Sequence, residues 1–326
     1  MRQHHSMSEY PSGKTRPTGL VTIDVEPDNV WADTNSQSLN NVRYLPIFHR
    51  LCQDYGVRPT YLLSYSIAKD DDSSAIIQSL LRKGDCEVGM HPHLWETPPL
   101  VSQDFSGRAC VGPDYTCAEL EAKLTSLANL IKTRFGIPLS HRAGRWGIDI
   151  QQVDILNKLG IKFDTSILPG VDWSSTGILD HTKAPLNPYR MGPHDVCQPG
   201  TGILLQVPCT IKPGLRFVGL ENNRYAAAII RRLGFGNKWL RVSPSITSAD
   251  LLKTCAWASV RFPQLNIMSH SSEFMAGGSP YWRSEADVAC HLDAYRHIFS
   301  WWQCNGIETK TLAEFGQNYL AEHTLS

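Results

Sequence analysis

The sequence predicts an α/β fold, in which mostly parallel strands form a sheet or barrel and helices pack on its outside. Short apolar runs typical of buried strands alternate with amphipathic stretches along most of the 326 residues. Such alternation is typical of parallel strands connected by helices. No internal repeat or low-complexity linker divides the chain. We therefore expect one domain over residues 18–326, preceded by a flexible arm over 1–17.

The first half of the chain gives the clearest elements. Apolar runs predict strands at 19–23, 60–63 and 86–90, and apolar residues at helical spacing predict helices over 45–55 and 75–83. A glycine follows each of these helices, as is common at helix C-termini. The helix over 117–135 has the strongest pattern, because Thr116 and Glu119 form a capping box and Gly136 ends it.

The second half continues the alternation. A strand near Leu139 precedes a helix over 149–159 that ends at Gly160. Further strands are expected at 161–163, 204–207 and 265–268, and further helices over 225–233, 249–260 and 285–303, before a short segment at 307–311 and a short terminal helix. Three long segments break the rhythm, at 96–115, 168–200 and 210–224. Long loops in a compact domain usually form the walls or lids of a functional site, although the proline and glycine content of these segments also suits plain surface loops.

Composition and charge exclude several classes of protein. The chain has 31 basic and 31 acidic residues, so no net field attracts nucleic acid or an anionic membrane. No apolar window is long enough for a membrane span, and the polar N-terminus lacks the apolar run of a signal peptide. The nine scattered cysteines include no C-x-x-C pair, which disfavours a disulfide framework or a zinc ribbon. We therefore expect a cytoplasmic protein that binds no nucleic acid.

Polar side chains gather at the C-terminal ends of the predicted strands. They are Asp24 and Glu26 after the first strand, His91 and His93 after the third, Arg142 and Arg145 after the strand near Leu139, Asp164 after 161–163, and His270 after 265–268. Active sites of α/β barrels are built at this edge. We therefore expect these residues to share one site.

The segment His91-Pro92-His93 is the strongest candidate for a metal site. Pro92 disfavours a helical conformation of His91, and residues two apart in an extended chain face the same side. Two imidazoles and a carboxylate from a neighbouring strand form a usual open site for zinc or a similar ion. Asp24 and Glu26 are also two apart, so one could bind the metal while the other acts as general base. A surface histidine pair and two acids in a turn are the ordinary alternatives.

Two further residues would complete a hydrolytic site. Arg142 could hold the base through a bidentate ion pair, or could be an ordinary surface arginine. His270, alone at a strand end, suits a general acid, although a lone histidine is often structural.

In their order along the chain, these motifs resemble those of the polysaccharide deacetylase family, also called the NodB-homology domain. The resemblance runs from Gly19 to about Phe315. It is carried by Thr22-Ile-Asp-Val-Glu26, Glu87 to Trp95, His141 to Gly147, Phe163-Asp-Thr-Ser166 with Asp172-Trp173, and Met268-Ser-His270. It implies a distorted (β/α) barrel of mostly parallel strands and a divalent metal, with zinc expected, that serves to deacetylate N-acetyl or O-acetyl sugars.

The resemblance also implies roles for individual residues. The implied catalytic residues are Asp24 as base, Arg142 as its anchor and His270 as general acid, and the implied metal ligands are Glu26, His91 and His93. The implied substrate-binding residues are Trp95, Arg145, Trp146, Asp164, Trp173 and Glu273, with Tyr281 and Trp282 as further rings that could stack on a sugar. Asp164 or Glu273 would also orient His270. A backbone N–H beyond Arg142 would help the metal to stabilise the oxyanion.

Two departures from the family pattern mark a divergent subgroup. The usual first motif has adjacent aspartates, whereas Val25 separates Asp24 from Glu26 here. The usual histidine motif is H-x-x-x-H, whereas Trp95 occupies its last position and the second histidine is His93. These departures leave the set of metal ligands open.

The sequence therefore predicts a metal-dependent hydrolase that removes an N-acetyl or other acyl group from a sugar. The expected substrate is a carbohydrate or a nucleotide-linked or lipid-linked sugar. The alternatives are a catalytically inactive carbohydrate-binding or scaffold protein on the same barrel, and a hydrolase of small amides or ureides. A metal phosphoesterase is disfavoured, because there the histidine pair normally leads the chain, and here Asp24 precedes it.

Overall fold

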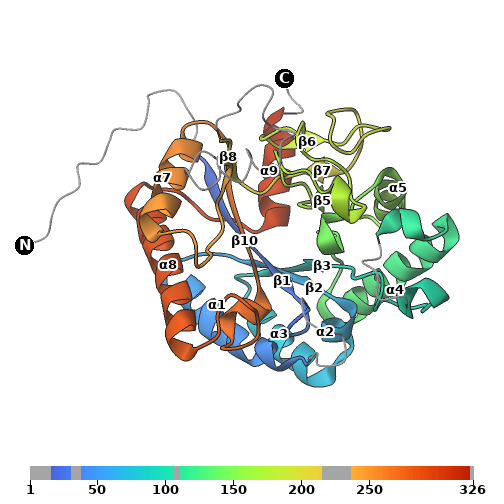
Figure 1. Cartoon of the computed structure of the whole chain (residues 1–326), viewed down its shortest axis with the longest axis horizontal. Coiled ribbons are helices and arrows are strands. Elements are labelled where there is room, and N and C mark those ends of the chain that lie inside the picture. The colour runs from blue at the N-terminus through green and yellow to red at the C-terminus, as the bar shows by residue number, and fades with distance from the viewer. Residues whose placement is uncertain (1–15, 31–37, 106–110, 215–235, 324–326) are drawn as a thin grey trace, which may run out of the picture.

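Eight strands form one curled, mostly parallel sheet at the centre of the molecule (Figure 1). The structure is a computed structural model that describes residues 16–30, 38–105, 111–214 and 236–323. The strands follow the order β10-β1-β2-β3-β4-β5-β7-β6, in which β6 pairs antiparallel with β7 and the other pairs are parallel. Their bounds are β1 Thr18–Val25, β2 Thr60–Leu63, β3 Glu87–Met90, β4 Ser140–His141, β5 Phe163–Asp164, β6 Tyr189–Arg190, β7 Leu205–Gln206 and β10 Gln264–His270. The prediction of mostly parallel strands is confirmed.

Helices surround this sheet, with α7, α8 and α1 along one side in Figure 1 and α4 and α5 along the other. Their bounds are α1 Leu45–Asp54, α2 Tyr65–Lys69, α3 Asp71–Leu81, α4 Cys117–Phe135, α5 Ile150–Lys158, α7 Ser248–Ser259, α8 Glu285–Cys304 and α9 Leu312–His323. The helix over 117–135 and its capping box at Thr116 and Glu119 are confirmed. Helix α3 begins earlier than predicted, because the Asp70 side chain accepts a hydrogen bond from the Ser73 N–H at 2.8 Å and caps it.

The alternation of side chains along β1 positions the site. Val21, Ile23 and Val25 belong to the main apolar core. Thr22 and Asp24 point to the opposite face, because successive residues of a strand alternate between faces. The Thr22 hydroxyl lies there against Arg142, at 2.6 Å, among other buried polar groups. The interior of the curled sheet is therefore polar near the C-terminal ends of its strands.

The segment after β7 reaches back to β10 and curls the sheet toward a barrel. The Thr210 N–H donates to the Asn266 carbonyl at 3.0 Å, and the Asn266 N–H donates to the Thr210 hydroxyl at 2.9 Å. A short antiparallel pair, β8 (Ile211–Lys212) and β9 (Lys238–Trp239), follows this contact. The curl brings β10 and β7, the two ends of the parallel run, close together.

Several elements differ from the sequence prediction. Helix α2 and strands β6, β8 and β9 are short and were not predicted. Of the segment 307–311, Thr309 forms a single isolated bridge with Gly19. The helix expected over 225–233, and residues 1–15 of the expected N-terminal arm, lie outside the described residues.

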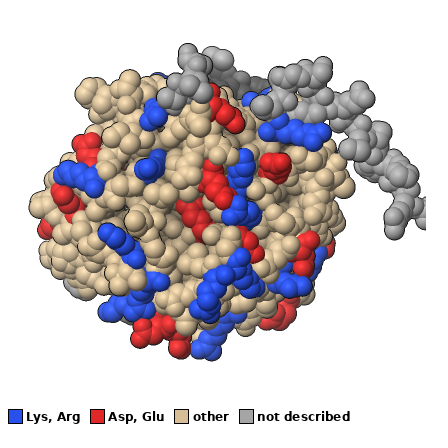
Figure 2. All heavy atoms as spheres, turned by 180° about the vertical axis from the view of Figure 1, so that it is seen from behind, with Lys and Arg blue, Asp and Glu red and all other residues tan. Residues whose placement is uncertain are grey.

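The surface carries both signs of charge. Figure 2 shows Lys and Arg interspersed with Asp and Glu over the face opposite to Figure 1, as the equal counts of basic and acidic residues predict. Among the described helices, none combines the length and apolar character that crossing a bilayer requires.

Candidate active site

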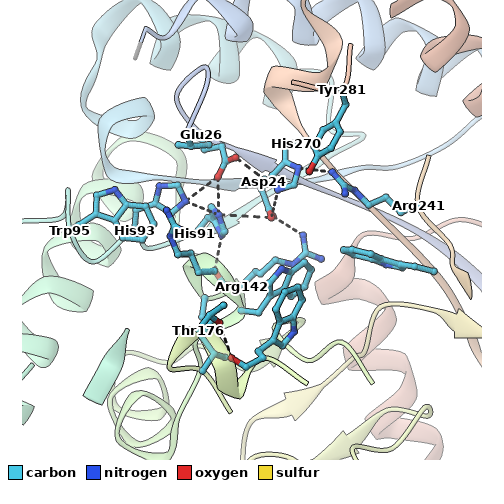
Figure 3. A pocket seen from close by; sticks show the side chains of 17 residues that line it. Asp24, Glu26, His91, His93, Trp95, Arg142, Thr176, Arg241, His270 and Tyr281 are labelled. Atoms are coloured by element: carbon cyan, nitrogen blue, oxygen red, sulfur yellow. Dashed lines mark hydrogen bonds and ion pairs between the residues drawn. The ribbon is translucent and has the colours of Figure 1, made fainter. Parts of the chain in front are cut away.

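The two acids of the first motif lie at the C-terminal end of β1, between β2 and β10. Asp24 is the register partner of His270 on the parallel neighbour β10. Asp24 and Glu26 are 2% and 3% exposed. Buried carboxylates are rare unless they are paired or bind a cation, so their partners define the site (Figure 3).

Glu26, His91 and His93 converge on one point. The Nε2 atoms of His91 and His93 lie 3.1 Å apart. Glu26 Oε2 lies 3.4 Å from His91 Nε2 and 3.0 Å from His93 Nε2. All three side chains are buried. Asp24 Oδ2 is farther off, at 3.9 Å from His91 Nε2.

The chemistry of this trio fits a divalent cation. His91 Nδ1 faces the carbonyl oxygen of Arg142 at 2.9 Å. Because a carbonyl can only accept, Nδ1 carries the hydrogen, and the Nε2 of the neutral ring keeps its lone pair. A buried carboxylate and two imidazoles whose donor atoms converge can bind a cation between them, and two imidazoles with one carboxylate are a usual ligand set for zinc. The carbonyl of Arg142 also fixes the orientation of the His91 ring, as partners behind metal ligands do.

Because Glu26 and His91 lie so close together, each shifts the pKa of the other. Burial raises the pKa of the Glu26 carboxyl, but His270, His91 and His93 outweigh burial, so the net shift is downward. Burial lowers the pKa of His91, but the carboxylates of Asp24 and Glu26 outweigh it, so the net shift is upward. Glu26 and His91 therefore stabilise each other's charged forms.

Arg142 fixes the other acid. Its Nη1 donates to Asp24 Oδ1 at 2.6 Å, and its Nη2 donates to the Thr22 hydroxyl at 2.6 Å. Its Nε donates to the Thr165 carbonyl at 3.1 Å. Burial lowers the pKa of the guanidinium, but the carboxylate of Asp24 and other neighbours outweigh burial, so the net shift of the pKa is upward. Arg142 is thus a fully buried cation that orients Asp24 toward His91 and His270.

His270 lies on the far side of the two acids. Its Nε2 is 3.9 Å from both Asp24 Oδ2 and Glu26 Oε1. Behind it, Nδ1 lies 3.6 Å from Glu273 Oε1 and 3.3 Å from Arg241 Nη2. Arg241 also forms an ion pair with Glu273, and this pair outweighs burial and lowers the pKa of the Glu273 carboxyl. A buried Arg–Glu pair therefore backs the ring of His270.

A pocket with aromatic walls opens over these groups. Trp95 stacks on His93 with ring centroids 4.3 Å apart, and Trp146 and Trp239 meet edge to face at 5.5 Å. The residues that line the pocket are Asp24, Glu26, Val30, His91, His93, Trp95, Arg142, Ala143, Arg145, Trp146, Trp173, Thr176, Ile178, Trp239, Arg241, His270 and Tyr281. Indole and phenol rings with a few charged groups suit a polar ligand that has apolar faces, such as a sugar.

Three predicted residues lie elsewhere. Asp164 is fully buried outside the pocket, where its carboxylate pairs with His141 Nδ1 at 2.6 Å and accepts from Ser166. Asp164 therefore neither lines the pocket nor orients His270. Glu273 stands behind His270 rather than in the wall. Trp282 packs on His291 at 4.5 Å, inside the core.

The backbone beyond Arg142 is also engaged. The Ala143 N–H donates to the Ser166 hydroxyl at 2.8 Å, and the Gly144 N–H donates to the Pro92 carbonyl at 3.1 Å. These two N–H groups therefore hold the loop in place and are not free for an oxyanion.

Sequence reasoning missed Arg241 and Trp239. Both lie in or just after β9, a strand of two residues that no periodicity could reveal. Within Lys238-Trp239-Leu240-Arg241, two apolar residues stand between two charged ones, and this pattern is too short to predict a strand.

The fold is shared with solved structures of low sequence identity. No protein family profile matches the chain, and no curated protein matches it. A protein of Mycobacterium smegmatis described as a polysaccharide deacetylase is 15% identical with a TM-score of 0.55, over 96% of this chain and 93% of that one. A protein of Parabacteroides distasonis described as a glycoside hydrolase/deacetylase is 13% identical with a TM-score of 0.61, over 94% and 72%. The resemblance to polysaccharide deacetylases is confirmed at the level of the fold.

The same fold also carries another chemistry. A 4-alpha-glucanotransferase from Thermococcus litoralis is 11% identical with a TM-score of 0.55, over 93% of this chain and 40% of that one. Since one fold hosts different reactions, function has to be argued from the site.

Proposed function

We propose that this chain is a metal-dependent hydrolase that removes an acetyl or other acyl group from the amide nitrogen of a sugar. The observation that carries the proposal is the meeting of Glu26, His91 and His93 with the Arg142–Asp24 pair and His270 in one pocket. A metal site, a carboxylate base and an imidazole acid together suit metal-assisted hydrolysis of an amide.

Glu26, His91 and His93 would hold the divalent ion, and zinc suits the nitrogen and oxygen donors. A divalent ion there would polarise the acyl carbonyl and acidify a water molecule. Side chains of the protein would carry out the proton transfers.

Asp24 is the proposed general base. Arg142 occupies its Oδ1 at 2.6 Å, which leaves Oδ2 facing His91 and His270 at 3.9 Å each. This oxygen would take the proton of water as the water oxygen bonds to the acyl carbon. Because Arg142 is buried and also donates to the Thr22 hydroxyl and the Thr165 carbonyl, the Asp24 carboxylate is oriented before substrate arrives.

His270 is the proposed general acid. Its Nε2 faces the two carboxylates, and its Nδ1 is backed by Glu273 and Arg241. A proton on Nε2 would pass to the amide nitrogen as the carbon–nitrogen bond breaks. The products are the free amine and the carboxylic acid, so water supplies the oxygen and hydrogens that the two fragments gain.

The proposed substrate is an acylated sugar because the pocket walls are rings. Trp95, Trp146, Trp173, Trp239 and Tyr281 line it. Aromatic faces stack on the apolar faces of sugar rings, while the polar groups at the base reach the acyl amide.

Metal content and acyl release test the proposal together. The purified protein should contain about one zinc or another transition metal ion per chain, and His91→Ala and His93→Ala should lose it. His297→Ala is the matched control, because that histidine is on the surface with a side chain 52% exposed. Acetate release from N-acetylated sugars should require the metal, and Asp24→Asn should keep the metal but lose about 10²–10⁴-fold in rate.

A wild-type chain that neither contains nor binds a metal would contradict the proposed mechanism and favour the carbohydrate-binding alternative. A metal-loaded chain that opens small ureides but releases no acetate would favour the hydrolase of small amides.

A further inference from the structure

Arg145 occupies the rim of the pocket beside the histidine pair. Its side chain is exposed, and its guanidinium lies 5.1 Å from the centroid of the Trp95 ring. The same indole stacks on His93, one of the proposed metal ligands. The Arg145 guanidinium and the His93 imidazole therefore both contact the Trp95 ring, so the cation lies close to the proposed metal ligands.

The other charged side chains of the pocket have partners of opposite sign. Asp24 pairs with Arg142, and Glu26 faces the imidazoles of His91 and His93. Arg241 pairs with Glu273. In the described part of the chain the Arg145 guanidinium forms no ion pair, and its contact is the aromatic face of Trp95. Its positive charge is therefore available to a ligand.

The backbone at this point is held in an unfavourable conformation. Arg145 has φ 53° and Trp146 has φ 63°, both in the left-handed region that disfavours L side chains. Such residues persist where their surroundings fix them, and they cluster at functional sites. Here the Trp146 N–H donates to the Ala143 carbonyl, and the Gly147 N–H donates to the Gly144 carbonyl, at 3.1 Å each. The turn projects Arg145 and Trp146 into the pocket wall together.

We propose that Arg145 binds an anionic group of the substrate, so that the acylated sugar is an acidic one. This inference rests on the proposed function for the identity of the ligand as a sugar. A guanidinium presents a planar fork that matches a carboxylate or a phosphate with two parallel hydrogen bonds. The anion could be the carboxylate of an acidic sugar or the phosphate of a phosphorylated or nucleotide-linked sugar.

Binding measurements with three related probes test this without requiring hydrolysis. The probes are N-acetylglucosamine, its 6-carboxylate N-acetylglucosaminuronic acid, and N-acetylglucosamine 1-phosphate. The four tryptophans in the pocket wall, Trp95, Trp146, Trp173 and Trp239, make intrinsic fluorescence a direct readout. At least one anionic probe should bind about tenfold or more tightly than the neutral sugar, since hydrogen bonds to charged groups are the stronger ones.

Substitution of the arginine should remove the preference for the anionic probe over the neutral sugar. Arg145→Gln should bring the anionic probe to the affinity of the neutral one, whereas Arg145→Lys should keep part of the difference, because it retains the charge but not the fork. Arg50→Gln is the matched control, because Arg50 is 74% exposed on α1 and pairs with Asp54 away from the pocket.

The outcomes distinguish a carboxylate from a phosphate as the anion. They also show whether this inference or the proposed function has failed. Tight binding of the uronic acid indicates an acidic sugar, and tight binding of the 1-phosphate indicates a phosphorylated or nucleotide-linked one. Equal affinity for all three probes, no binding of either anion, or a preference that survives Arg145→Gln would overturn the inference. If the metal-loaded protein releases acetate from none of the probes but still prefers the anionic ones, the proposed function is wrong and this inference stands.

Discussion

Asp24 and Arg142 lie 118 positions apart in the chain, and the Arg142 Nη1 donates to Asp24 Oδ1 at 2.6 Å in a fully buried ion pair. The pair joins the C-terminal end of β1 to the turn after β4, two strands that are not neighbours in the sheet. It therefore crosses the interior of the curled sheet. This contact ties Asp24 to the loop that carries Arg145.

Removal of the arginine should destabilise the fold as well as the site. Arg142→Met would leave the Asp24 carboxylate buried without its cation, which typically costs about 3–5 kcal/mol in the free energy of unfolding. Urea denaturation measures this cost, and acetate release should fall with it. In a double-mutant cycle with Asp24→Asn, the combined loss should be smaller than the sum of the two single losses, because the unpaired charge is gone. Additive losses would contradict a direct pairing.

Gly144 should be required for metal binding because of its close approach to the histidine motif. A Cβ added there would lie 2.7 Å from the Pro92 carbonyl oxygen and 2.8 Å from His93 Cδ2. Gly144→Ala should therefore shift His93 and weaken zinc affinity by about tenfold or more, as small losses of ligand positioning do. A competitive chelator titration measures the affinity.

Gly84→Ala is the control for this substitution. Gly84 has φ 71° and open space around it, so alanine should cost about 1 kcal/mol in stability and leave zinc affinity unchanged. Equal zinc affinity in Gly144→Ala and wild type would contradict the proposed ligand role of His93.

Lys123 should stabilise the loop that follows the histidine motif. This fully buried ammonium donates to the Leu94 carbonyl at 2.9 Å, the Thr97 carbonyl at 2.8 Å and Asp104 at 2.8 Å. Lys123→Met would leave the Asp104 carboxylate without its cation and should lower the free energy of unfolding by about 3–5 kcal/mol.

The exposed Lys158, which pairs with Glu121 at 3.1 Å, supplies the comparison for Lys123. Lys158→Met should cost at most about 1 kcal/mol in the same denaturation experiment. If Lys123→Met and Lys158→Met lowered the free energy of unfolding by similar amounts, the buried ammonium of Lys123 would not stabilise the loop.

His291 should make the protein less stable as the pH falls. It is buried among Phe274, Trp282 and Tyr295, and burial lowers its pKa to about 4 from an ordinary value of 6.5. Below pH 6.5 the unfolded chain takes up a proton that the folded chain does not, so stability falls until the folded pKa is reached. The loss attributable to this group is about 1.4 kcal/mol per pH unit between pH 6.5 and 4.

The comparison with His291→Gln isolates this effect from other titrating groups. The difference in unfolding free energy between wild type and variant should be constant above pH 6.5 and should move against the wild type below it. A difference that does not change with pH would show that His291 takes up a proton at the same pH in both states.

Local sequence signals were sufficient for much of the fold. The strand at Thr60–Leu63 and helix α4 at Cys117–Phe135 have the predicted bounds, because a buried apolar run and a capped amphipathic stripe are properties of consecutive residues. The placement of Asp24, His91 and His270 at strand ends was equally local. Parallel strands then bring those ends to one edge of the sheet, which explains why residues far apart in sequence could be expected in one place.

Tertiary structure decided the partners. The sequence allowed Asp164 or Glu273 behind His270, and packing gave Asp164 to His141 and Glu273 to His270 and Arg241. Glu273 is only three residues after His270, so that contact is local, whereas the pairing of Asp164 with His141 joins two neighbouring strands. The tertiary structure therefore decided the partner of Asp164, because β4 and β5 must pair in register to bring it to His141.

The sequence by itself determined the types of residue at the strand ends and the helices that cover the sheet, because periodicity and capping act between residues a few positions apart. The tertiary structure gave the distances that place Glu26 nearer the imidazoles than Asp24, as the resemblance implied, and it alone decided that Arg241 reaches the pocket. These relations depend on the register of neighbouring strands and on the contact between Thr210 and Asn266 that curls the sheet. Contacts between distant segments carry no local signal, so only the folded chain could specify them.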